Sequence, residues 1–539
     1  MRGRLDEAAS SQREAIRLRP DYFEAHVNLG VAMLRLTNPL EAERVLRQAL
    51  SLRPGAMPAR FHLAAALRQQ GRLTEAIESY LGIIEDAPDH AQAARELAHT
   101  YESAGCLEGA IDCFRRAVEL RPDDAAVAGS YAFTLFYERG ADAKLMRREH
   151  EAWAARHADR LTPKEIGHEN DRSPQRRLRI GYLSADFREH SVARFLGPLV
   201  VEHDRDGFEV CCYSDVGQPD AVTARLKKAA ERWVDVRARS DEEVAGIIQR
   251  DRIDVLVDPT GHMGGSRILV FARKPAPLQV AFPGYPGTCG LKAMDYLITD
   301  EYQDPPGLTG GHYCERPLYM NPSSRCYWIE DESPEVGPPP LLANGYPTFA
   351  SVSRPLKVTR RMVGLWCDVM RRMPDSRMLF LTDTRDPSEA CIEHRGWFEE
   401  ERIDARRVRF VAGGRRADYL RLFHQIDVNL DAFPYHGCTR TCDALWMGVP
   451  TVVLAGPTYI SRVGVSILSQ VGMQEFIAGS ESHYVELAVA AATNVDLLVE
   501  LRRTLRERTR RSPLMDAIGT TRSFERAVRG AWRQWCNSR

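Results

Sequence analysis

The 539-residue sequence contains no apolar run long enough to span a membrane and no excess of charge of either sign. A membrane-spanning helix needs about 18 or more consecutive apolar residues, so we expect no membrane partner. The 73 Lys and Arg residues balance 74 Asp and Glu residues, which leaves a net charge of −1. Such a chain does not bind nucleic acid by overall charge, and any site for an anion must therefore be local.

Signals for export and for metal binding are also missing. The N-terminal segment MRGRLDEAASSQREAIRLRP lacks the apolar stretch of a secretory signal. The 12 Cys residues form no CxxC pair, and no cluster of His, Cys and Asp has the spacing of metal ligands. A Walker loop and a GxGxxG fingerprint are absent as well. We therefore expect a cytoplasmic protein with free thiols and no metal site.

A period of 34 residues runs through the N-terminal part of the sequence. Prolines recur at this spacing, and so do small residues where two helices would approach closely. The recurring positions are Pro20, Pro54, Pro88 and Pro122, then Ala8, Ala42, Ala76 and Ala110, then Gly30, Ala64, Ala98 and Ala132. Each unit also carries an apolar helical stripe that only neighbouring repeats can cover, which is the pattern of the tetratricopeptide repeat.

The phase of this period predicts where each repeat begins. Residues 1–20 supply only the second helix of a repeat, and full repeats follow at 21–54, 55–88 and 89–122, with a partial one after them. Such arrays generally present a groove to peptides or proteins, and the alternative is a structural extension that only packs against the rest of the chain. Because the first repeat is incomplete, an oligomer that covers its exposed helix is one of the expected arrangements.

Beyond residue 175 the pattern changes to short apolar strands alternating with amphipathic helices, which predicts parallel sheets covered by helices. The Pro- and Gly-rich interval from about 300 to 345 is expected to be an irregular linker between two such sheets. The predicted domains are a repeat array (1–140), a helical linker (141–176), a first lobe (177–335) and a second lobe with C-terminal helices (336–539).

The segment LDAFPYHGCTRTCDALWMGVP in the second lobe has the order strand, turn, helix. Gly437 permits close backbone approach, and Thr439 and Thr441 place hydroxyls and amides at a helix start, where diphosphate oxygens bind well. Asp443, one turn further, could accept hydrogen bonds from a ribose. The alternative for the threonines is a purely structural helix cap.

Lys357 follows the predicted strand TFASVS, at the edge where a parallel sheet binds ligands. A cation at this point would stabilise the charge that builds on a departing phosphate. Arg354 and Arg462 are candidates of the same kind. Surface solvation is the alternative for each of these side chains.

In the first lobe, Asp186 and His190 lie in the loop after LRIGYLSADF, and His262 follows the strand of IDVLVDPT. Both loops leave carboxyl ends of strands, so the histidines are candidates for acid–base work or substrate orientation. A hydrogen-bonded structural histidine is the alternative. The segment FPGYPGTCG (282–290) is expected to be a shaped loop that lines a cleft.

Taken together, the repeats and five long motifs resemble the family of O-linked N-acetylglucosamine transferases and their Spindly-type relatives. The motifs are LRIGYLSADFREHSV, DPTGHMGGSR, KPAPLQVAFPGYPGTCGLKAMDYLITD, FASVSRPLKVT and LDAFPYHGCTRTCDALWMGVPTVVLAGPTYISRVGVSIL. The resemblance implies an α-solenoid followed by a GT-B fold of two Rossmann-like lobes. It also implies metal-independent, inverting transfer of a sugar from a nucleotide sugar, held mainly by the second lobe, to Ser or Thr hydroxyls of proteins.

The same resemblance implies roles for single residues. Lys357 resembles the family lysine that contacts the nucleotide diphosphate, Thr439 and Thr441 resemble the phosphate-binding loop, and Asp443 resembles the ribose-binding acid. His190 and His262 match histidines that line the sugar and acceptor pocket, and Asp186 lies in the motif of His190. The general base stays open, with His190 as one candidate.

The sequence departs from the family pattern at two arginines. Arg440 stands where a run of Thr is usual, and Arg354 stands where an amide residue is common, so extra charge beside the diphosphate could alter the preferred donor. N-acetylglucosamine carried by UDP is the first choice, and GDP-fucose is the alternative. The column that carries an Asn ladder in animal members reads Asn28, His62, Glu96 and Ser130, which weakens that mode of peptide recognition.

Two other functions stay open at this stage. Arg354 and Arg440 would fit a peptide-binding scaffold whose lobes have lost catalysis. A glycosyltransferase that acts on small molecules or polysaccharide is the third alternative, and the fused repeat array argues against it.

Overall fold

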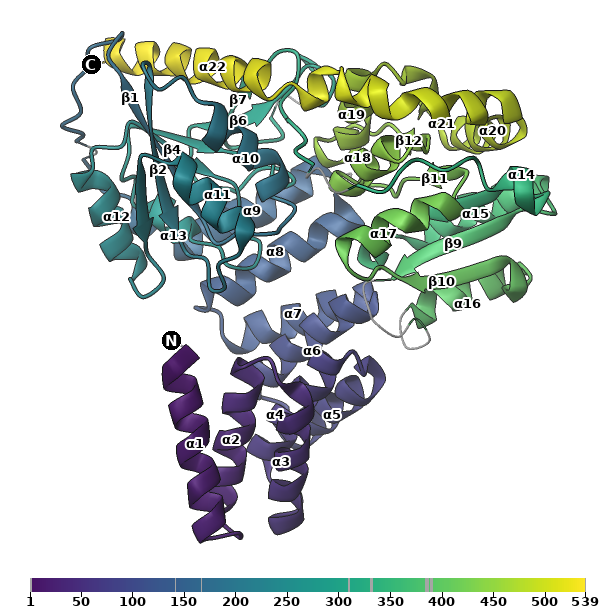
Figure 1. The fold of residues 1–539 in the computed structure, drawn as a ribbon. Helices are drawn as coiled ribbons and strands as arrows, with labels where there is room; N and C mark the ends of the chain where they lie inside the picture. Colours follow the sequence, from purple (N-terminus) through teal and green to yellow (C-terminus); the bar gives the residue numbers. More distant parts are fainter. Residues whose placement is uncertain are drawn as a thin grey trace.

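The structure, a computed structural model, describes residues 2–140, 142–165, 167–308, 311–329, 333–382, 387 and 391–538. It consists of a helical array followed by two lobes, each built on a parallel sheet (Figure 1). The predicted fold class is therefore confirmed. Within the described residues, no helix combines the length and apolar character that crossing a bilayer requires.

The array is a series of antiparallel helices whose bounds follow the 34-residue period. Gly71 and Gly105 end α4 and α6 with φ of +84° and +81°, which is why glycine recurs at the turn inside a repeat. A Cβ on Gly30 would lie 2.6 Å from Leu46 Cγ, so the column of small residues reflects close helix packing. The helices are α1 (Arg2–Leu18), α2 (Phe23–Arg35), α3 (Pro39–Leu52), α4 (Met57–Gln70), α5 (Leu73–Asp86), α6 (Ala91–Ala104), α7 (Leu107–Leu120), α8 (Ala125–Arg139) and α9 (Ala143–His157).

The first lobe is a seven-stranded parallel sheet in the order β3-β2-β1-β4-β5-β6-β7. Its central strands are buried along most or all of their length, because helices cover both faces of a parallel sheet. The strands are β1 (Leu178–Ser184), β2 (Phe208–Ser214), β3 (Arg232–Asp235), β4 (Val255–Asp258), β5 (Leu278–Ala281), β6 (Tyr296–Thr299) and β7 (Arg316–Tyr319); the helices are α10 (Ala193–Glu202), α11 (Ala221–Ala229), α12 (Asp241–Arg250) and α13 (Ile268–Ala272).

The second lobe is a six-stranded parallel sheet in the order β10-β9-β8-β11-β12-β13. Its strands are β8 (Thr348–Ser351), β9 (Arg377–Thr382), β10 (Val408–Ala412), β11 (Val428–Leu430), β12 (Thr451–Leu454) and β13 (Ile477–Ala478). The helices are α14 (Leu341–Asn344), α15 (Arg360–Arg372), α16 (Ile392–Glu400), α17 (Arg416–Leu422), α18 (Thr439–Trp446), α19 (Val463–Val471), α20 (Glu481–Thr493), α21 (Val495–Arg510) and α22 (Ala517–Asn537).

The prediction of an irregular linker over the whole interval 300–345 is wrong at two places, at a short strand and at helix α14 (Leu341–Asn344). Arg316–Tyr319 form β7, which pairs in parallel with β6 at the edge of the first sheet. The Pro and Gly residues around this short strand hide it, and Pro317 is tolerated because an edge strand needs fewer ladder hydrogen bonds.

The C-terminal helix joins the second lobe back to the first. In Figure 1, α22 (yellow) continues from α21 across the top of the molecule to the first lobe. There Glu525 accepts a hydrogen bond at 2.9 Å from Nδ1 of His203, and Arg529 donates to the Gly207 carbonyl at 3.1 Å. The two lobes are therefore connected twice, once by the interval near 320–345 and once by α22.

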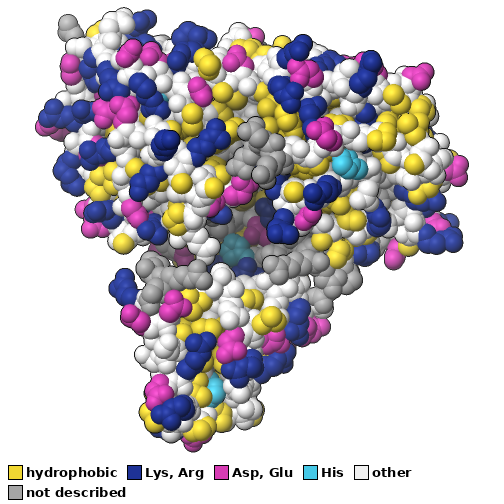
Figure 2. All heavy atoms as spheres, viewed as in Figure 1, with side chains coloured by type: hydrophobic (Ala, Val, Ile, Leu, Met, Phe, Trp, Pro, Cys, Tyr) yellow, Lys and Arg dark blue, Asp and Glu magenta, His cyan; other side chains and the backbone are white. Residues whose placement is uncertain are grey.

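The array is packed against both lobes through helices of its C-terminal half, among them α6 and α9. His150 of α9 accepts a hydrogen bond at 2.6 Å from the Tyr285 hydroxyl, and the ring of Trp153 meets the ring of His262 edge to face at 4.3 Å. The backbone N–H of Cys391 in the second lobe donates to the Ala104 carbonyl at the end of α6, at 3.2 Å. Figure 2 shows a hollow on this face where the array meets the lobes, with charges of both signs spread over the surface.

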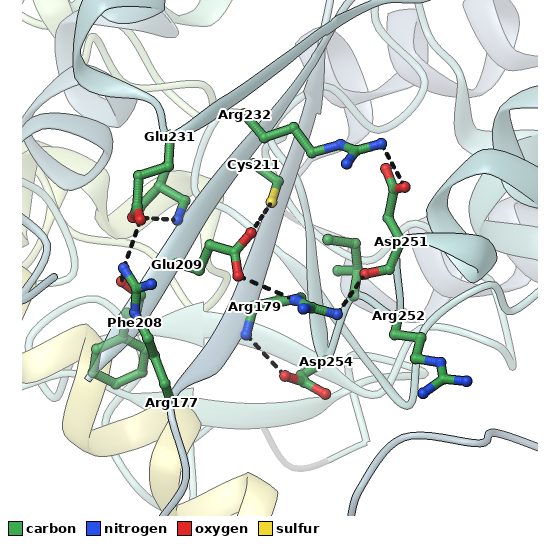
Figure 3. A network of polar contacts seen from close by, with 12 residues as sticks. Arg177, Arg179, Phe208, Glu209, Cys211, Glu231, Arg232, Asp251, Arg252 and Asp254 are labelled. Atoms are coloured by element: carbon green, nitrogen blue, oxygen red, sulfur yellow. Dashed lines mark hydrogen bonds and ion pairs between the residues drawn. The ribbon is translucent and has the colours of Figure 1, made fainter. Parts of the chain in front are cut away.

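A network of ion pairs covers the amino-terminal edge of the first sheet (Figure 3). Arg177 pairs with Glu231 at 2.6 Å, and Arg232 pairs with Asp251 at 2.6 Å. Asp254 is fully buried and accepts from the Arg179 backbone N–H at 2.8 Å and from both terminal nitrogens of Arg176. This edge lies opposite the carboxyl ends of the strands, so the network stabilises the sheet rather than forming the predicted cleft.

Candidate functional site

A cavity of about 250 Å³ lies between the two lobes and the array. Loops after the carboxyl ends of strands in both sheets form most of its wall, as expected for paired parallel sheets. Helix α8 adds Phe133 and Tyr137, so residues of the predicted repeat array also line the cavity. Tyr137 stacks on Tyr435 of the second lobe, with ring centroids 5.1 Å apart.

The charged residues on the cavity wall all carry positive charge. Arg325, Arg354, Lys357 and Arg440 line the cavity, and among the described residues no Asp or Glu does so. A concave site with guanidinium and ammonium groups and no carboxylate attracts an anion. The sequence predicted that any anion site must be local, and this cavity has the charge for one.

Lys357 ends a short 3-10 helix after β8 that begins at Pro355. Its Nζ donates to the His436 carbonyl at 2.9 Å and lies 3.7 Å from the ring centroid of Tyr435. Burial lowers the pKa of Lys357 to about 7; Asp431 opposes this shift, and Arg440 and Arg354 reinforce it. An anion in the cavity would favour the charged form of this amine.

Asp431, directly after β11, organises the loop that carries Gly437 and Thr439. Its buried carboxylate accepts from the Gly437 N–H at 2.8 Å, from the Thr441 hydroxyl at 3.2 Å and from the Ser353 hydroxyl at 3.3 Å. A Cβ on Gly437 would lie 2.5 Å from Thr441 Oγ1, which explains the glycine.

Helix α18 begins on the cavity wall. Its N-cap residue Cys438 makes no side-chain capping hydrogen bond, and Cys438, Thr439 and Arg440 line the cavity with Gly437. The first N–H groups of a helix lack intrahelical acceptors and carry partial positive charge. The amino-terminal end of α18 therefore adds to the positive character of the wall.

Three residues predicted to bind the nucleotide do not line the cavity. The Thr441 hydroxyl is used by Asp431, and Asp443 is buried and accepts from Arg416 at 2.7 and 2.5 Å and from the Tyr327 hydroxyl. Arg462 donates to the Tyr302 carbonyl at 3.0 Å. Their side chains support the loops behind the wall, whereas Arg354, Gly437, Thr439 and Arg440 lie on it.

His190 lies half-buried on the cavity wall, and Asp186 is buried behind it. Asp186 Oδ1 is 3.5 Å from Nδ1 of His190. Burial raises the pKa of Asp186 and lowers the pKa of His190, and each partner's charge opposes the shift of the other. The carboxylate is placed to stabilise an imidazolium, so this pair could take up a proton from a bound hydroxyl.

His262, predicted on the pocket wall, lies behind it. Its Nε2 bonds the Cys289 carbonyl at 2.8 Å, and its ring packs between Trp153 and His150 of α9. Burial lowers the pKa of His262 to about 3, so the ring stays neutral. The neighbouring Met263 faces the cavity instead, and the position of His262 corresponds to the structural alternative.

Sequence reasoning missed Arg325, Asp431 and Tyr435. Asp431 could have been found, because it is a carboxylate directly after a buried strand. Tyr435 lay within the predicted loop but carries no charge. Arg325 gave no signal, because it lies in the interval expected to be a linker.

Metal ligands are not grouped in the described part of the chain: no set of three His, Cys, Asp or Glu side chains there could hold an ion. The positive charge of the cavity wall comes from the four cationic side chains and from the amino-terminal end of α18.

The structure thus combines two parallel-sheet lobes, a cationic cavity between them and a helical repeat array, which is the architecture that the motifs predicted. Comparison with known families assigns the chain to one of them. The chain belongs to glycosyl transferase family 41, whose profile matches residues 143–334 and 346–523. Tetratricopeptide repeat profiles match residues 2–56, 32–89 and 67–132. The resemblance drawn from the motifs is confirmed.

The chain is similar to several known proteins. A probable UDP-N-acetylglucosamine–peptide N-acetylglucosaminyltransferase SPINDLY from Solanum lycopersicum is 35% identical over 412 residues, covering 75% of this chain and 43% of the relative. The probable enzyme SEC from Arabidopsis thaliana is 30% identical, covering 67% and 38%. The chain thus spans less than half the length of these curated relatives. A mutant Thermobaculum terrenum O-GlcNAc transferase superposes with a TM-score of 0.89 at 31% identity, covering 95% of this chain and 98% of that one.

Proposed function

We propose that this chain is an inverting glycosyltransferase that moves a sugar from a nucleotide sugar to Ser or Thr hydroxyls of proteins. The observation that carries the proposal is the cavity between the lobes. Four cationic side chains and the start of α18 line it, and no carboxylate of the described residues does so. Family membership supports the reaction class.

The proposed reaction is a single displacement. The acceptor oxygen forms a bond to the anomeric carbon while the bond from that carbon to the diphosphate oxygen breaks, so the configuration inverts. Charge builds on the departing diphosphate, where charged Lys357 and the N–H groups of α18 would stabilise it. The hydroxyl proton would pass to a base, for which His190 backed by Asp186 is one candidate.

Metal independence is part of this proposal. Leaving-group charge needs a positive partner, which many transferases obtain from a divalent ion. Here Arg325, Arg354, Lys357 and Arg440 would supply that charge from the chain itself.

UDP-N-acetylglucosamine is the proposed donor. Support comes from the SPINDLY and SEC relatives, whose names specify this donor and a peptide acceptor. GDP-fucose stays the alternative, since Arg354 and Arg440 alter the charge beside the proposed diphosphate site.

The proposed acceptors are proteins that reach the cavity along the array, because Phe133 and Tyr137 of α8 connect the array to the cavity wall.

A cytoplasmic location is also proposed. It is supported by the thiols: all 12 Cys residues are free, which suits a reducing compartment.

A donor panel tests the proposal. The chain is incubated with UDP- and GDP-linked sugars and a protein extract, and sugar transfer is measured by mass spectrometry for the wild type and for the Lys357→Met variant. We expect transfer from UDP-N-acetylglucosamine that the variant loses. Transfer only from GDP-fucose would overturn the donor, and nucleotide binding without any turnover would favour the inactive scaffold.

A further inference from the structure

We propose that Arg325 is a donor-binding residue that contacts the diphosphate of the nucleotide sugar. This inference rests on the proposed function, and it adds a contact from outside the second lobe. Arg325 follows β7 in the segment that joins the lobes, before β8 begins. It lines the same cavity as Lys357 and the start of α18, although the residue is only 2% exposed.

The guanidinium of Arg325 has neutral hydrogen-bond partners. Its Nη1 donates to the side-chain oxygen of Gln303 and, at 3.1 Å, to the Ser324 hydroxyl. Asp300 makes no hydrogen bond or ion pair with it: the Ser324 hydroxyl donates to Asp300 Oδ2 at 2.6 Å, and the Asp300 charge favours the charged guanidinium without direct contact. The Nε–H of Arg325 is buried and has no hydrogen-bond acceptor among the described residues, while the guanidinium as a whole has the Cys438 thiol, a weak acceptor, within hydrogen-bonding reach.

The groups packed around this cation do not neutralise it. The Tyr459 ring centroid lies 5.8 Å from the guanidinium carbon, and the thiol of Cys438 is a neighbour whose pKa burial raises. Phenol and thiol are both uncharged near pH 7 under these conditions. Because a guanidinium stays charged in proteins, Arg325 is a buried cation without a direct anionic partner.

Such a group is costly unless an anion completes it. Removing an ion from water is unfavourable, and a buried N–H without an acceptor adds to this cost. A phosphate oxygen is the acceptor that best fits a guanidinium, because it offers charge together with hydrogen-bond geometry.

The position of Arg325 specifies which part of the donor it meets. Cys438, its neighbour, is the N-cap of α18, so the guanidinium lies beside the helix end whose N–H groups attract anions. Two independent features, a buried cation with an unmet donor and an uncapped helix start, converge on one wall of one cavity. Their shared ligand is a diphosphate.

Arg325 lies in a different part of the chain from the other groups that would bind the diphosphate. Lys357 and α18 belong to the second lobe, whereas Arg325 follows the last strand of the first sheet. A diphosphate bound by all three would link the segment between the lobes to the second lobe. Bound nucleoside diphosphate should therefore raise the melting temperature, and this increase should depend on Arg325.

The test uses titration calorimetry on the full chain with UDP and GDP, taking the tighter nucleotide as the probe. We expect Arg325→Met to weaken its binding at least about tenfold, as loss of a charge-assisted contact should. Arg325→Gln, which keeps hydrogen bonding but not charge, should show a loss of similar size. The matched control is Arg316→Met, an exposed arginine on β7 outside the cavity, which should bind like the wild type.

The outcomes separate this inference from the proposed function. A wild-type chain that binds neither nucleotide would overturn the proposed function. If the wild-type chain binds a nucleotide and either folded Arg325 variant binds it equally well, only the proposed role of Arg325 is overturned. In turnover assays the loss should appear in the KM for the donor and persist at every pH from 6 to 9, because the guanidinium does not titrate there.

Discussion

At the scale of single residues, the environment of Lys357 decides how the site responds to pH. The amine lies close to the Tyr435 ring, and Arg354 and Arg440 repel its charge. A pKa of about 7 means that the free protein holds a mixture of charged and neutral amine near neutral pH. The charged form is the one that suits a diphosphate, so binding should be coupled to proton uptake.

Nucleotide affinity should therefore depend on pH through Lys357. We expect the Kd for the nucleoside diphosphate to rise as pH increases through about 7, because deprotonation removes the charge that the ligand meets. Lys357→Met should abolish this dependence and lower kcat on the order of 10²- to 10³-fold. Calorimetry in buffers of different ionisation enthalpy measures the proton uptake; equal heats in all buffers would contradict the assignment.

At the scale of elements, the join between α9 and the first lobe is built from two neutral imidazoles. Burial lowers the pKa of His150 to about 4 and that of His262 to about 3. In the unfolded chain these histidines have pKa values near 6.5, so below that pH they bind protons that they do not bind in the folded chain. Stability is therefore fully present above about pH 6.5 and is lost as pH falls toward the folded values.

Acid should thus weaken this join. Each imidazole should cost roughly 3 kcal/mol of stability by pH 4 relative to neutral pH. His262→Gln should flatten the fall of the melting temperature between pH 6.5 and pH 4, whereas His483→Gln, at an exposed position, should leave it unchanged. Identical pH profiles for the wild type and His262→Gln would show that this ring does not resist protonation.

The edge network of the first sheet offers a second test at this scale. Asp254→Ala leaves Arg176 and the Arg179 N–H without their acceptor in a buried site, so it should cost about 3–5 kcal/mol. Glu209→Ala removes a partly exposed partner of Arg179 and should cost about 1 kcal/mol or less. Urea unfolding of both variants measures the difference; equal losses would mean that burial of Asp254 contributes nothing.

At the scale of the whole molecule, the array, the two lobes and α22 form one connected body. Helix α22 links the lobes, and α6, α8 and α9 contact them. Because α8 contributes to the cavity wall, deleting everything up to residue 150 would damage the site itself. A cut after α5 would separate the proposed protein recognition from the proposed chemistry more cleanly.

Removal of residues 1–88 should therefore leave donor binding intact. We expect unchanged Kd for the nucleotide and unchanged transfer to a short peptide, with at least about tenfold weaker transfer to a protein acceptor that needs the array. Alanine at Phe133 in the full chain is the comparison, and it should impair transfer to both acceptors because Phe133 lines the cavity. Unchanged use of protein acceptors by the truncated chain would show that residues 1–88 do not recruit the acceptor.

Much of this architecture follows from patterns that are local in sequence. The 34-residue period fixes the helix pairs, because each repeat must present the same small and apolar residues to its neighbours. Runs such as LRIGYLS and VLVD form buried strands because they are apolar along nearly their whole length. Loops after these strands meet at one edge of each sheet, so His190, Lys357 and the 437–443 loop could be predicted as neighbours of one cleft.

The direction in which each side chain of those loops points could be found only from the tertiary structure. Thr439 lines the cavity and Thr441 does not, because successive residues of a helix are turned by about 100°, and two steps direct the second hydroxyl toward Asp431. Met263 faces the cavity while His262, one residue earlier, turns back onto Trp153. Sequence alone therefore determined the repeats, the sheets and the edge where the site lies. The fold decided which side chains face the cavity, and it brought Arg325 there from a segment without any local pattern, since contacts between distant segments leave no periodic trace in the chain.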